Sequence, residues 1–524
     1  MTDGAPAQFL LFPGRHHVLT RFQAQFLARH AAAGATIVWP VTSANHHTTR
    51  RNPVPFHRRE AAIERMSAAH GLTSLVVPIN DVPPTDDFAQ ITVKACEVAL
   101  GIDLSPTTAT VACSTPTVAA LYAAAGYRIL PVEDAVPDNP ARPGAPVRRP
   151  WQLLEQIAAG DPLWREFADP ASVDVLTRYR LDEHIVRVVN DPVIGADGGL
   201  TTTRDYRTYA ESFEGASDRK WEQISAHVRP GRILDIGCAT GALLQRIDAD
   251  PRFHESDLIG VEVARHLMAE CEHKVAQGLF TNPNVFFHQR NMLGDAIFPP
   301  DSIDTSISIA LTHEIWSYAP AKDPLSRRQT LLRFCRQIAR HTTPDGVWIN
   351  SDVCGPDEPD RPVRLRLDDS DGCNPNDTSE LGDLDAPAVT ELVTGLSTRA
   401  RFFQFVRDFA ANAGVRIEYR RDGDDVVLRL ADAMDFLTRK DYVENWLSES
   451  HEQFCGLSWQ QWQQLLGEAG LELLPGSASW RNDWIIDNRI APVAQLHGLD
   501  GAELDWPVTH LLAVAGPAPS HGTS

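Results

Sequence analysis

The sequence predicts an α/β protein with two doubly wound sheets, the second of which carries an inserted cap. Its 524 residues exceed what one hydrophobic core usually serves, so we expect more than one domain. Short apolar runs alternate with amphipathic helical stretches in two separate series, the pattern of parallel sheets covered by helices. Turn-forming residues between 185 and 200 separate the two series.

The first series defines a predicted domain over residues 1–185. Its expected strands are the apolar runs Phe9–Phe12, Thr36–Val41, Ser74–Pro78, Thr108–Ala112 and Tyr127–Pro131. Residues 134–150 are rich in Pro, Ala and Arg and lack periodicity, so we expect an exposed loop there. A helical segment follows from Trp151 to about Arg180.

The second series defines a predicted core over residues 186–353, and residues 453–524 return to the same sheet. After a helix over Lys220–Val228, the expected strands are Ile233–Ile236, Leu258–Glu262, Val285–His288, Thr305–Ile309, Gly346–Ser351, Leu471–Leu474 and His510–Ala515. Residues 354–452 interrupt this rhythm with an Asp/Pro/Asn-rich loop, a helix near Arg399–Asn412 and a polar hairpin around 420–429. We expect this insertion to cap the second domain.

Composition and charge narrow the classes of partner. The formal net charge of −21 would repel a phosphate backbone, and no run of Lys and Arg offsets it, so we expect no nucleic-acid partner. The eight cysteines form no Cys-x-x-Cys pair, which indicates a reducing cytoplasm and no metal site. We expect neither secretion nor membrane insertion, because a signal-like leader and a bilayer-length apolar window are both missing. The oligomeric state stays open, a homo-oligomer included.

A glycine-rich turn follows the first strand of the second series, in Arg232-Ile-Leu-Asp-Ile-Gly-Cys-Ala-Thr-Gly241. Glycines at such a turn let backbone N–H groups approach a ligand that side chains would otherwise block. The pattern differs from the Gly-x-Gly-x-x-Gly of dinucleotide sites, because Ala239 stands where their second glycine would be. The next strand ends in Glu262, a carboxylate able to accept hydrogen bonds from both ribose hydroxyls.

In order and spacing these residues resemble the class I S-adenosylmethionine (SAM)-dependent methyltransferases over roughly residues 200–515. The resemblance implies a Rossmann-like sheet with SAM as the cofactor. It also implies that the cofactor pocket contains Asp235, Gly237, Cys238, Gly241, Glu262, Asn291, Met292 and Ala310. Asn291 follows the third strand, where its carbonyl oxygen would accept from the adenine amine. The alternative is a Rossmann-like sheet that binds no cofactor.

The segment Ala310-Leu-Thr-His-Glu-Ile-Trp-Ser-Tyr318 follows the fourth strand, at the edge where doubly wound sheets bind their ligands. His313 is a candidate general base, with Glu314 orienting it, although either side chain could simply cap a helix. His451 is a further catalytic candidate, and Trp316 and Tyr318 are candidate substrate contacts. His451 and the tryptophans at 446, 459, 480 and 484 are candidates for the substrate wall.

Residues 8 to about 180 resemble archaeal-type nicotinamide mononucleotide adenylyltransferases, of the nucleotidyltransferase superfamily. The resemblance rests on Leu11-Phe-Pro-Gly-Arg15, the segment from Thr42 to Arg59, and Pro78-Ile-Asn-Asp81. It implies that a nucleotide contacts Gly14, Arg15, Ser43, Asn52 and Arg59. The superfamily's His/Thr-x-Gly-His signature falls on Thr20-Arg-Phe-Gln23, where the Gly and the final His are missing. Neutral Gln23 cannot supply the positive charge that stabilises a transferring phosphoryl group. His16 and His17 lie nearby and could substitute only with a shifted register.

The sequence therefore predicts a SAM-dependent O- or N-methyltransferase that acts on a small molecule. A nucleotide or a pyridine-nucleotide derivative of specialised metabolism is one such substrate, held by the degenerate first domain. The alternatives are a bifunctional nucleotidyltransferase–methyltransferase and a non-catalytic sensor of nucleotide and SAM.

Overall fold

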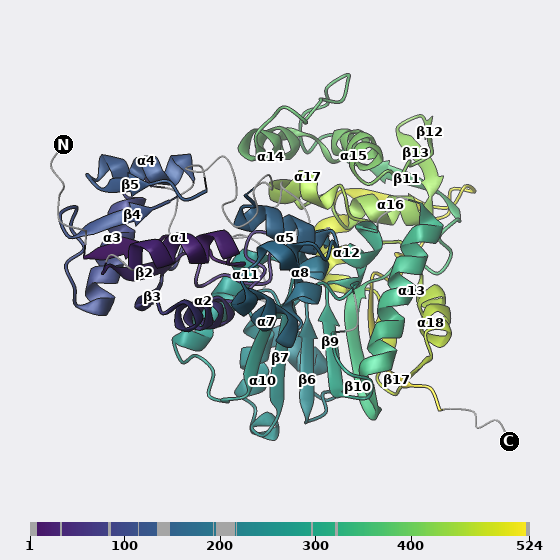
Figure 1. Cartoon of the computed structure of the whole chain (residues 1–524). Helices are drawn as coiled ribbons and strands as arrows, with labels where there is room; N and C mark the ends of the chain where they lie inside the picture. Colours follow the sequence, from purple (N-terminus) through teal and green to yellow (C-terminus); the bar gives the residue numbers. More distant parts are fainter. Residues whose placement is uncertain are drawn as a thin grey trace. The chain divides into compact units, whose positions relative to one another are not determined.

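The computed structural model describes residues 8–519 apart from 32–33, 82–84, 114, 134–146, 192, 195–214, 216, 295–296 and 320–322. The chain divides into two compact units, Met1–Gly198 and Gly199–Ser524 (Figure 1). The predicted boundary at residue 185 falls inside helix α8 (Leu181–Asn190), which buries Leu181, Ile185 and Val188. The turn predicted at 195–199 and most of the predicted loop at 134–150 lie outside the described residues.

The first unit is built on a five-stranded, wholly parallel sheet. In spatial order its strands are β3 (Ser74–Pro78), β2 (Thr36–Val41), β1 (Phe9–Leu11), β4 (Ala109–Ala112) and β5 (Arg128–Leu130). All five predicted strands are present, within two residues of their predicted ends. Leu10 packs into one hydrophobic core and its neighbours Phe9 and Leu11 into another, because side chains alternate along a strand.

Helices cover both faces of this sheet. They are α1 (Arg21–Ala31), α2 (Phe56–His70), α3 (Phe88–Leu100), α4 (Pro116–Ala124), α5 (Pro150–Ala158), α6 (Trp164–Phe167), α7 (Pro170–Arg178) and α8. Buried residues of α1, α2, α5, α6, α7 and α8 share one core, and those of α3 and α4 share the other. The strand order reverses direction beside β1, so a ligand-binding crevice is expected where β1 and its neighbours end.

The second unit contains a larger mixed sheet. Its spatial order is β8 (Val285–Gln289), β7 (Asp257–Glu262), β6 (Arg232–Ile236), β9 (Ile303–Ile309), β10 (Thr342–Val353), β17 (His510–Pro517) and β14 (Leu471–Leu473). The five strands from β8 to β10 are parallel, and β17 is antiparallel to both of its neighbours. A further strand, β15 (Ala478–Trp480), also pairs with β17. Every strand predicted for this sheet is present.

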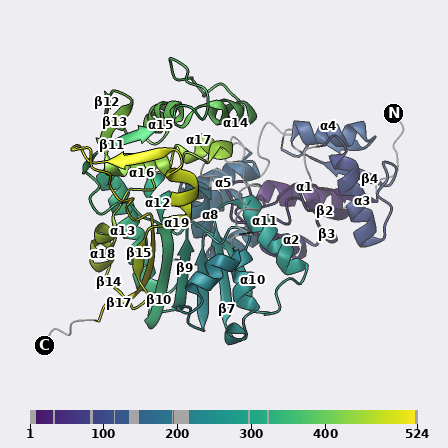
Figure 2. The same cartoon turned by 180° about the vertical axis from the view of Figure 1, so that it is seen from behind.

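Two helical layers sandwich this sheet (Figures 1 and 2). Their helices are α10 (Ala242–Asp248), α11 (Arg265–Ala276), α12 (Thr312–Ser317), α13 (Pro324–His341) and α18 (Trp459–Glu468), with a helical segment over 217–224 and a short 3-10 turn, η2 (Pro251–Phe253). Leu234 and Ile236 pack into one core and Ile233 into the other, again by strand alternation. The sheet is therefore buried on both faces, as its nearly continuous apolar strands predict.

A separate α/β subdomain lies at the end of the sheet where β9 leads into α12 (Figure 1). It contains a four-stranded antiparallel sheet in the order β12 (Tyr419–Asp422), β13 (Asp425–Arg429), β11 (Pro362–Leu367) and β16 (Ala494–His497). Its helical segments are α14 (Ala386–Gly395), α15 (Thr398–Asn412), α16 (Leu430–Leu437), η3 (Val443–Asn445), α17 (Trp446–Glu449), α19 (Asp483–Ile485) and the π-helical turn η4 (Ile486–Ile490). The predicted insertion is thus a folded cap with its own core.

The cap extends beyond the predicted limits of 354–452. Strand β16 pairs with β11, and Ile486, Ile490 and Leu496 are buried in the cap's core. The predicted domain 453–524 therefore contributes to two sheets rather than one. A four-residue strand has too little pattern for its partner to be read from sequence, because pairing over such a distance is decided by tertiary packing.

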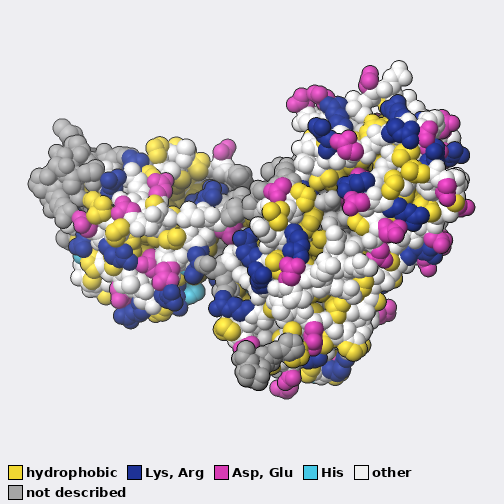
Figure 3. Space-filling model, turned by 90° about the vertical axis from the view of Figure 1, so that its right-hand side faces the viewer, with side chains coloured by type: hydrophobic (Ala, Val, Ile, Leu, Met, Phe, Trp, Pro, Cys, Tyr) yellow, Lys and Arg dark blue, Asp and Glu magenta, His cyan; other side chains and the backbone are white. Residues whose placement is uncertain are grey.

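The molecular surface carries mixed charge. On the face drawn in Figure 3, Lys and Arg side chains lie intermixed with Asp and Glu side chains. Within the described residues, no helix combines the length and the apolar character required to cross a membrane.

Candidate functional site

The glycine loop of the second unit joins β6 to α10. Gly237 and Gly241 both have positive φ, of 71° and 74°, which is why glycine suits these two positions. A Cβ atom on Gly237 would lie 3.1 Å from Leu311 Cδ1, and one on Gly241 would lie 3.0 Å from Phe287 Cζ. The loop therefore keeps its shape and its access only with glycine at both positions.

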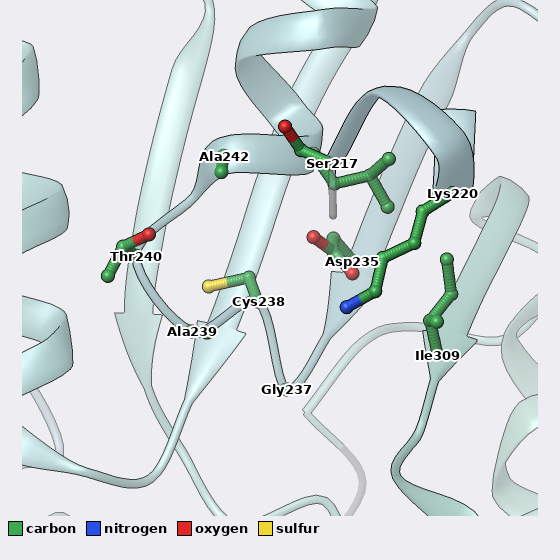
Figure 4. Close-up of a pocket in the computed structure, with 10 residues that line it drawn as sticks. Ser217, Lys220, Asp235, Gly237, Cys238, Ala239, Thr240, Ala242 and Ile309 are labelled. Atoms are coloured by element: carbon green, nitrogen blue, oxygen red, sulfur yellow. The ribbon is translucent and has the colours of Figure 1, made fainter. Parts of the chain in front are cut away.

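A pocket of about 350 Å³ opens along this loop (Figure 4). Its lining residues are Ser217, Lys220, Asp235, Gly237, Cys238, Ala239, Thr240, Ala242, Leu243 and Ile309. Three of the predicted cofactor residues, Asp235, Gly237 and Cys238, are among them, and Gly241 lies between two others. Lys220 and Ser217 were not predicted, because they precede the recognisable motif by more than ten residues.

Asp235 and Lys220 form an opposed pair of charges in this pocket. Lys220 extends from its helix toward the Asp235 carboxylate (Figure 4). Burial raises the pKa of Asp235 to about 7, against the opposing effect of Lys220 and with the help of Glu262. Burial also lowers the pKa of Lys220 to about 8, although Asp235 acts to raise it. Both groups are therefore poised to change charge near neutral pH.

Glu262 ends β7 and faces the glycine loop. Its Oε2 accepts from the Ala239 backbone N–H at 3.0 Å, and its Oε1 accepts from Val263 and Ala264 at 2.7 and 2.9 Å. Burial raises the pKa of Glu262 to about 7 despite these three donors. A carboxylate offers about four lone-pair positions, so one further acceptor position is left on Oε2. The carboxylate thus has room for one ribose hydroxyl, where the sequence suggested two.

Two non-glycine residues beside the pocket have strained backbones. Ala239 in the loop has φ of 48°, and Ala310, directly after β9, has φ of 54°. Such conformations cost of order 1–3 kcal/mol and collect at ligand sites. Ala310 is held by donating its N–H to the Ser351 carbonyl at 2.9 Å. The strain therefore lies where two neighbouring strands end at the same edge.

Asn291 and Met292 lie after β8, as expected, but their surroundings differ from the prediction. Asn291 Oδ1 accepts from the Leu293 backbone N–H at 2.9 Å, a local turn that engages the oxygen predicted to face adenine. The Met292 side chain is buried in the core of the unit.

His313 stands at the start of α12 and is held by a carboxylate from the neighbouring strand. Asp352, at the end of β10, accepts from His313 Nδ1 at 2.7 Å and from the His313 backbone N–H at 3.1 Å. Asp352 also accepts from Thr312 Oγ1 at 2.6 Å and from the Val353 N–H at 2.7 Å. The imidazole is thereby fixed in one orientation.

The other ring nitrogen of His313 faces the cap. Its Nε2 lies 3.3 Å from Oε2 of Glu452, and the side chains of Asp352 and Glu452 are each only 1% exposed. Burial alone would lower the pKa of His313, but the charges and hydrogen bonds of Asp352 and Glu452 outweigh it and hold that pKa well above its usual value. Glu314 is also buried, with a carboxylate oxygen within 4.8 Å of the His313 and Glu452 atoms.

The other predicted catalytic and substrate-contacting residues lie near His313 and Glu452. Tyr318 donates its hydroxyl to Glu452 Oε1 at 3.4 Å and stacks on His451 with ring centroids 6.3 Å apart. The His451 Nδ1 atom is engaged with the Leu447 carbonyl. Trp316 donates to Gln453 Oε1 at 2.8 Å. The structure thus brings together His313, Glu314, Trp316, Tyr318 and His451.

A second pocket, of about 240 Å³, lies beside His313. Its lining residues are Thr312, His313, Trp316, Leu331, Val353, Gln453, Phe454, Gly456, Leu457 and Trp462. The late tryptophans suggested by the sequence do not build it: Trp446 is buried in the cap, and Trp484 is 60% exposed. Trp462 and the segment 453–457 take their place.

Among the comparisons with known proteins, only the one with solved structures found matches. No protein-family model and no curated protein matches the sequence. The order β8-β7-β6-β9-β10 is the doubly wound order 3-2-1-4-5, and β17 and β14 extend it with an antiparallel edge. The carboxy-terminal unit has a Rossmann-like α/β fold.

Three solved structures illustrate the likeness. A SAM-dependent methyltransferase from Clostridium acetobutylicum is 11% identical, with 60% of this chain and all of that chain covered and a TM-score of 0.29. A chain from the complex of the Haloferax volcanii Trm112 methyltransferase activator with a methyltransferase is 12% identical (61% and 99% covered, TM-score 0.30). Geranyl diphosphate C-methyltransferase from Streptomyces coelicolor, solved with Mg²⁺, geranyl diphosphate and S-adenosyl-L-homocysteine, is also 12% identical (62% and 89% covered, TM-score 0.31). The strand order of the chain itself decides the fold.

In the second unit, the polar residues missed by sequence reasoning come from three distant segments. Asp352 directly follows a predicted strand, so its place at the carboxyl edge of the sheet was readable. Lys220 and Glu452 carried no such signal, because a helix before the motif and a loop within the cap reach the edge only through tertiary packing.

The first unit places its predicted residues at the carboxyl edge of its own sheet. Arg59 is fully buried and donates to the carbonyls of Arg15, Thr42 and Ser43 at 2.8–3.0 Å. Gly14 lies in the same cluster, because its carbonyl accepts from the Thr42 N–H. Asn52 is buried in the loop before α2, its N–H donating to Thr49 Oγ1 at 3.0 Å. His16, Ser43 and Thr48 all have positive φ.

Gln23, on which the predicted signature histidine would fall, is engaged in hydrogen bonds within the first unit. Gln23 and Thr20 cap α1 reciprocally, and Gln23 Nε2 donates to Glu133 Oε1 at 3.0 Å. The neighbouring histidines are uncharged near neutral pH, because burial lowers the pKa of His16 to about 4 and that of His17 well below its usual value. None of these three side chains supplies a cation.

Proposed function

We propose that the carboxy-terminal unit is a SAM-dependent methyltransferase that acts on a small molecule. The observation that carries this proposal is the buried acidic pair, Asp235 and Glu262, beside a glycine loop at the carboxyl edge of the sheet. SAM supplies a methyl group on a positively charged sulfur. Buried carboxylates favour a cationic ligand over a neutral or anionic one, and Glu262 retains an acceptor position for a ribose hydroxyl.

The pocket residues fit this cofactor in shape as well as in charge. Leu311 and Phe287 lie close to the positions that Cβ atoms would take at Gly237 and Gly241. The loop backbone itself therefore forms the floor of the pocket. Asp235 would balance the cationic end of the ligand, and Lys220 would face its carboxylate. Cys238 and Thr240 would line the nucleoside, with Asn291 and Met292 farther out and Ala310 turning the chain toward the acceptor.

The acceptor is proposed to enter from the pocket beside His313. Its lining combines aromatic and aliphatic residues with the polar side chains of His313, Thr312 and Gln453. This composition suits a small molecule with one or two polar groups. In-line methyl transfer depends mainly on proximity and orientation, which Trp316, Tyr318 and the cap would provide.

His313, Glu314 and His451 remain the proposed catalytic residues, but their proposed roles differ from those that the sequence predicted. His313 has one ring nitrogen on Asp352 and the other beside Glu452, and its raised pKa keeps it protonated, so an acceptor proton would go to the Glu452 carboxylate. Glu452, in the loop after α17 of the cap, is thus added to the proposed catalytic residues. O-methylation and N-methylation both meet these requirements.

A second function, recognition of a nucleotide by the first unit, is favoured by its charge. Arg15 and the buried Arg59 put positive charge at the carboxyl edge of a doubly wound sheet, where phosphates bind in such folds. The donors of Arg59 are taken by carbonyls, so Arg59 would shape the loop while Gly14, Ser43 and Asn52 contact the ligand. Adenylyl transfer is not proposed, because Gln23 and its neighbours lack a cation.

One experiment separates these functions. Full-length protein is incubated with SAM and small-molecule fractions of a cell extract, and S-adenosylhomocysteine is measured. We expect its formation with at least one fraction and none in buffer alone. Binding of SAM without turnover in any fraction would favour the sensor instead. Pyrophosphate release from nicotinamide mononucleotide and ATP would revive the bifunctional alternative.

A further inference from the structure

We infer that His313, Glu314 and Glu452 form a binding site for a divalent metal ion, which the sequence did not predict. One nitrogen and two carboxylate oxygens from these side chains all lie within 4.8 Å of one another. They come from the start of α12 and from the loop after α17, so the core and the cap of the methyltransferase unit both contribute. The inference goes beyond the proposed methyl transfer and does not depend on it.

The spacing of the donor atoms suits a single ion. Bonds of about 2.0–2.2 Å to Zn²⁺ place two ligands of a tetrahedral ion roughly 3.3–3.6 Å apart. His313 Nε2 and Glu452 Oε2 are already separated by 3.3 Å. Glu314, whose carboxylate lies within the same 4.8 Å set, needs only a side-chain adjustment to complete a three-ligand site.

Asp352 gives the imidazole the orientation that a metal ligand requires. Metal-binding histidines usually donate their second ring N–H to a carboxylate, which fixes the tautomer and the ring plane. Because an ionised carboxylate can only accept, the 2.7 Å contact puts a proton on His313 Nδ1 and directs Nε2 toward Glu452. The proton that Nε2 shares with Glu452 in the metal-free protein leaves when the ion binds. Asp352 is itself fixed by Thr312 and Val353.

The charge of the group suits a cation. Asp352, Glu314 and Glu452 are all buried, at 4%, 7% and 1% exposure, around a single imidazole. Arg439 also acts on Glu452, but its guanidinium is bonded to Asp435 at 3.0 Å. Three carboxylates around one histidine favour the entry of two positive charges.

The donor set selects the kind of ion. One imidazole nitrogen with carboxylate oxygens suits Zn²⁺ or Mn²⁺ rather than Ca²⁺, which prefers six to eight oxygens. Three protein ligands leave a coordination position open, as in catalytic rather than structural zinc sites. His313 also lines the 240 Å³ pocket, so an oxygen-bearing acceptor could reach that position.

The test is metal binding by full-length protein stripped with a chelator and then titrated with ZnCl₂ or MnCl₂ in a calorimeter. We expect one ion per chain and a rise in melting temperature with metal concentration, because the ion binds only the folded state. His313→Gln and Glu452→Gln should weaken binding at least tenfold. Asp352→Asn, which alters only the partner of the ligand, should weaken it about 10–100-fold.

Matched controls use an exposed histidine and an exposed glutamate. His273→Gln on α11 and Glu468→Gln on α18 should bind the ion like the wild type. Absence of a stoichiometric site in the wild type would overturn the inference without needing any variant. Binding that persists unchanged in both His313→Gln and Glu452→Gln would also overturn it. Binding of SAM, measured without metal, is a separate readout, so failure of the metal site leaves the proposed function standing.

Discussion

The two units place very different chemistry at the same position of a doubly wound parallel sheet. At the carboxyl edge of the first sheet, Arg59 is buried among backbone carbonyls, and the nearby histidines are neutral. At the corresponding edge of the second sheet, Asp235 and Glu262 are buried beside an open pocket. The difference teaches that topology sets where a ligand binds, whereas a few buried charges set which ligand binds.

The largest expected effect comes from removing the buried cation of the first unit. Arg59→Met would leave the carbonyls of Arg15, Thr42 and Ser43 without their donors, at a cost of roughly 3 kcal/mol or more. We expect an earlier unfolding transition of the first unit in calorimetry, with SAM affinity within twofold of the wild type. A loss of SAM binding in this variant would show that the two edges are not independent.

The variant Glu262→Gln tests whether the carboxyl edge of the second sheet binds SAM. The Gln amide would face backbone N–H donors, and the remaining acceptor position for ribose would be weakened. Loss of charge-assisted hydrogen bonds worth about 3 kcal/mol corresponds to roughly 100-fold weaker SAM binding. The exposed variant Glu468→Gln serves as the control. An affinity within a factor of two of the wild type would remove Glu262 from the cofactor site.

A smaller change in SAM affinity is expected when the pH is changed. Because the pKa values of Asp235 and Glu262 are raised to about 7, these groups are mostly protonated at pH 6 and mostly ionised at pH 8. The ionised fraction of each carboxyl group rises about tenfold between pH 6 and 8, so SAM affinity should rise about tenfold for each of the two groups that must be ionised. Asp235→Asn should remove the share of this rise that Asp235 contributes and leave the share of Glu262. A flat profile in the wild type would contradict the account.

The stability of the ligand-free protein should follow the opposite trend. The folded state holds a proton on Asp235 more tightly than the unfolded chain, whose carboxyl titrates near 4. The contribution of Asp235 to the free energy of unfolding is therefore largest below about pH 4, falls as pH rises to about 7, and is constant above. Denaturant titrations at pH 5 and 8, compared between the wild type and Asp235→Asn, measure it.

The smallest effect is expected at the position of the missing signature histidine. Gln23→Ala would remove a helix cap and the hydrogen bond to Glu133, at a cost of about 1 kcal/mol to the first unit. Nucleotide binding, measured by calorimetry, should be unchanged, because the amide of Gln23 is engaged within the protein. Weaker nucleotide binding would make Gln23 a ligand contact instead.

The sequence predicted the elements that have periodic patterns, and it did not predict the parts whose position depends on tertiary packing. The strands of both sheets and the glycine loop carry local signals, because buried parallel strands are apolar runs and turns with positive φ need glycine. Strand β16, Lys220 and Glu452 carry none, since each reaches its place only when distant segments pack together. The position of Glu262 at the end of its strand was predicted, but not its three backbone donors, which depend on the shape of the folded loop.

The central claim is that the glycine-loop edge of the second unit binds SAM. Calorimetric titration of SAM into the full-length protein tests it most directly, with Gly237→Val as the variant that places a side chain against Leu311 in a left-handed backbone. We predict one site per chain, competition by S-adenosylhomocysteine, and no detectable binding by the variant while its fold persists in circular dichroism. Absence of binding by the wild type, or equal binding by Gly237→Val, would contradict the account.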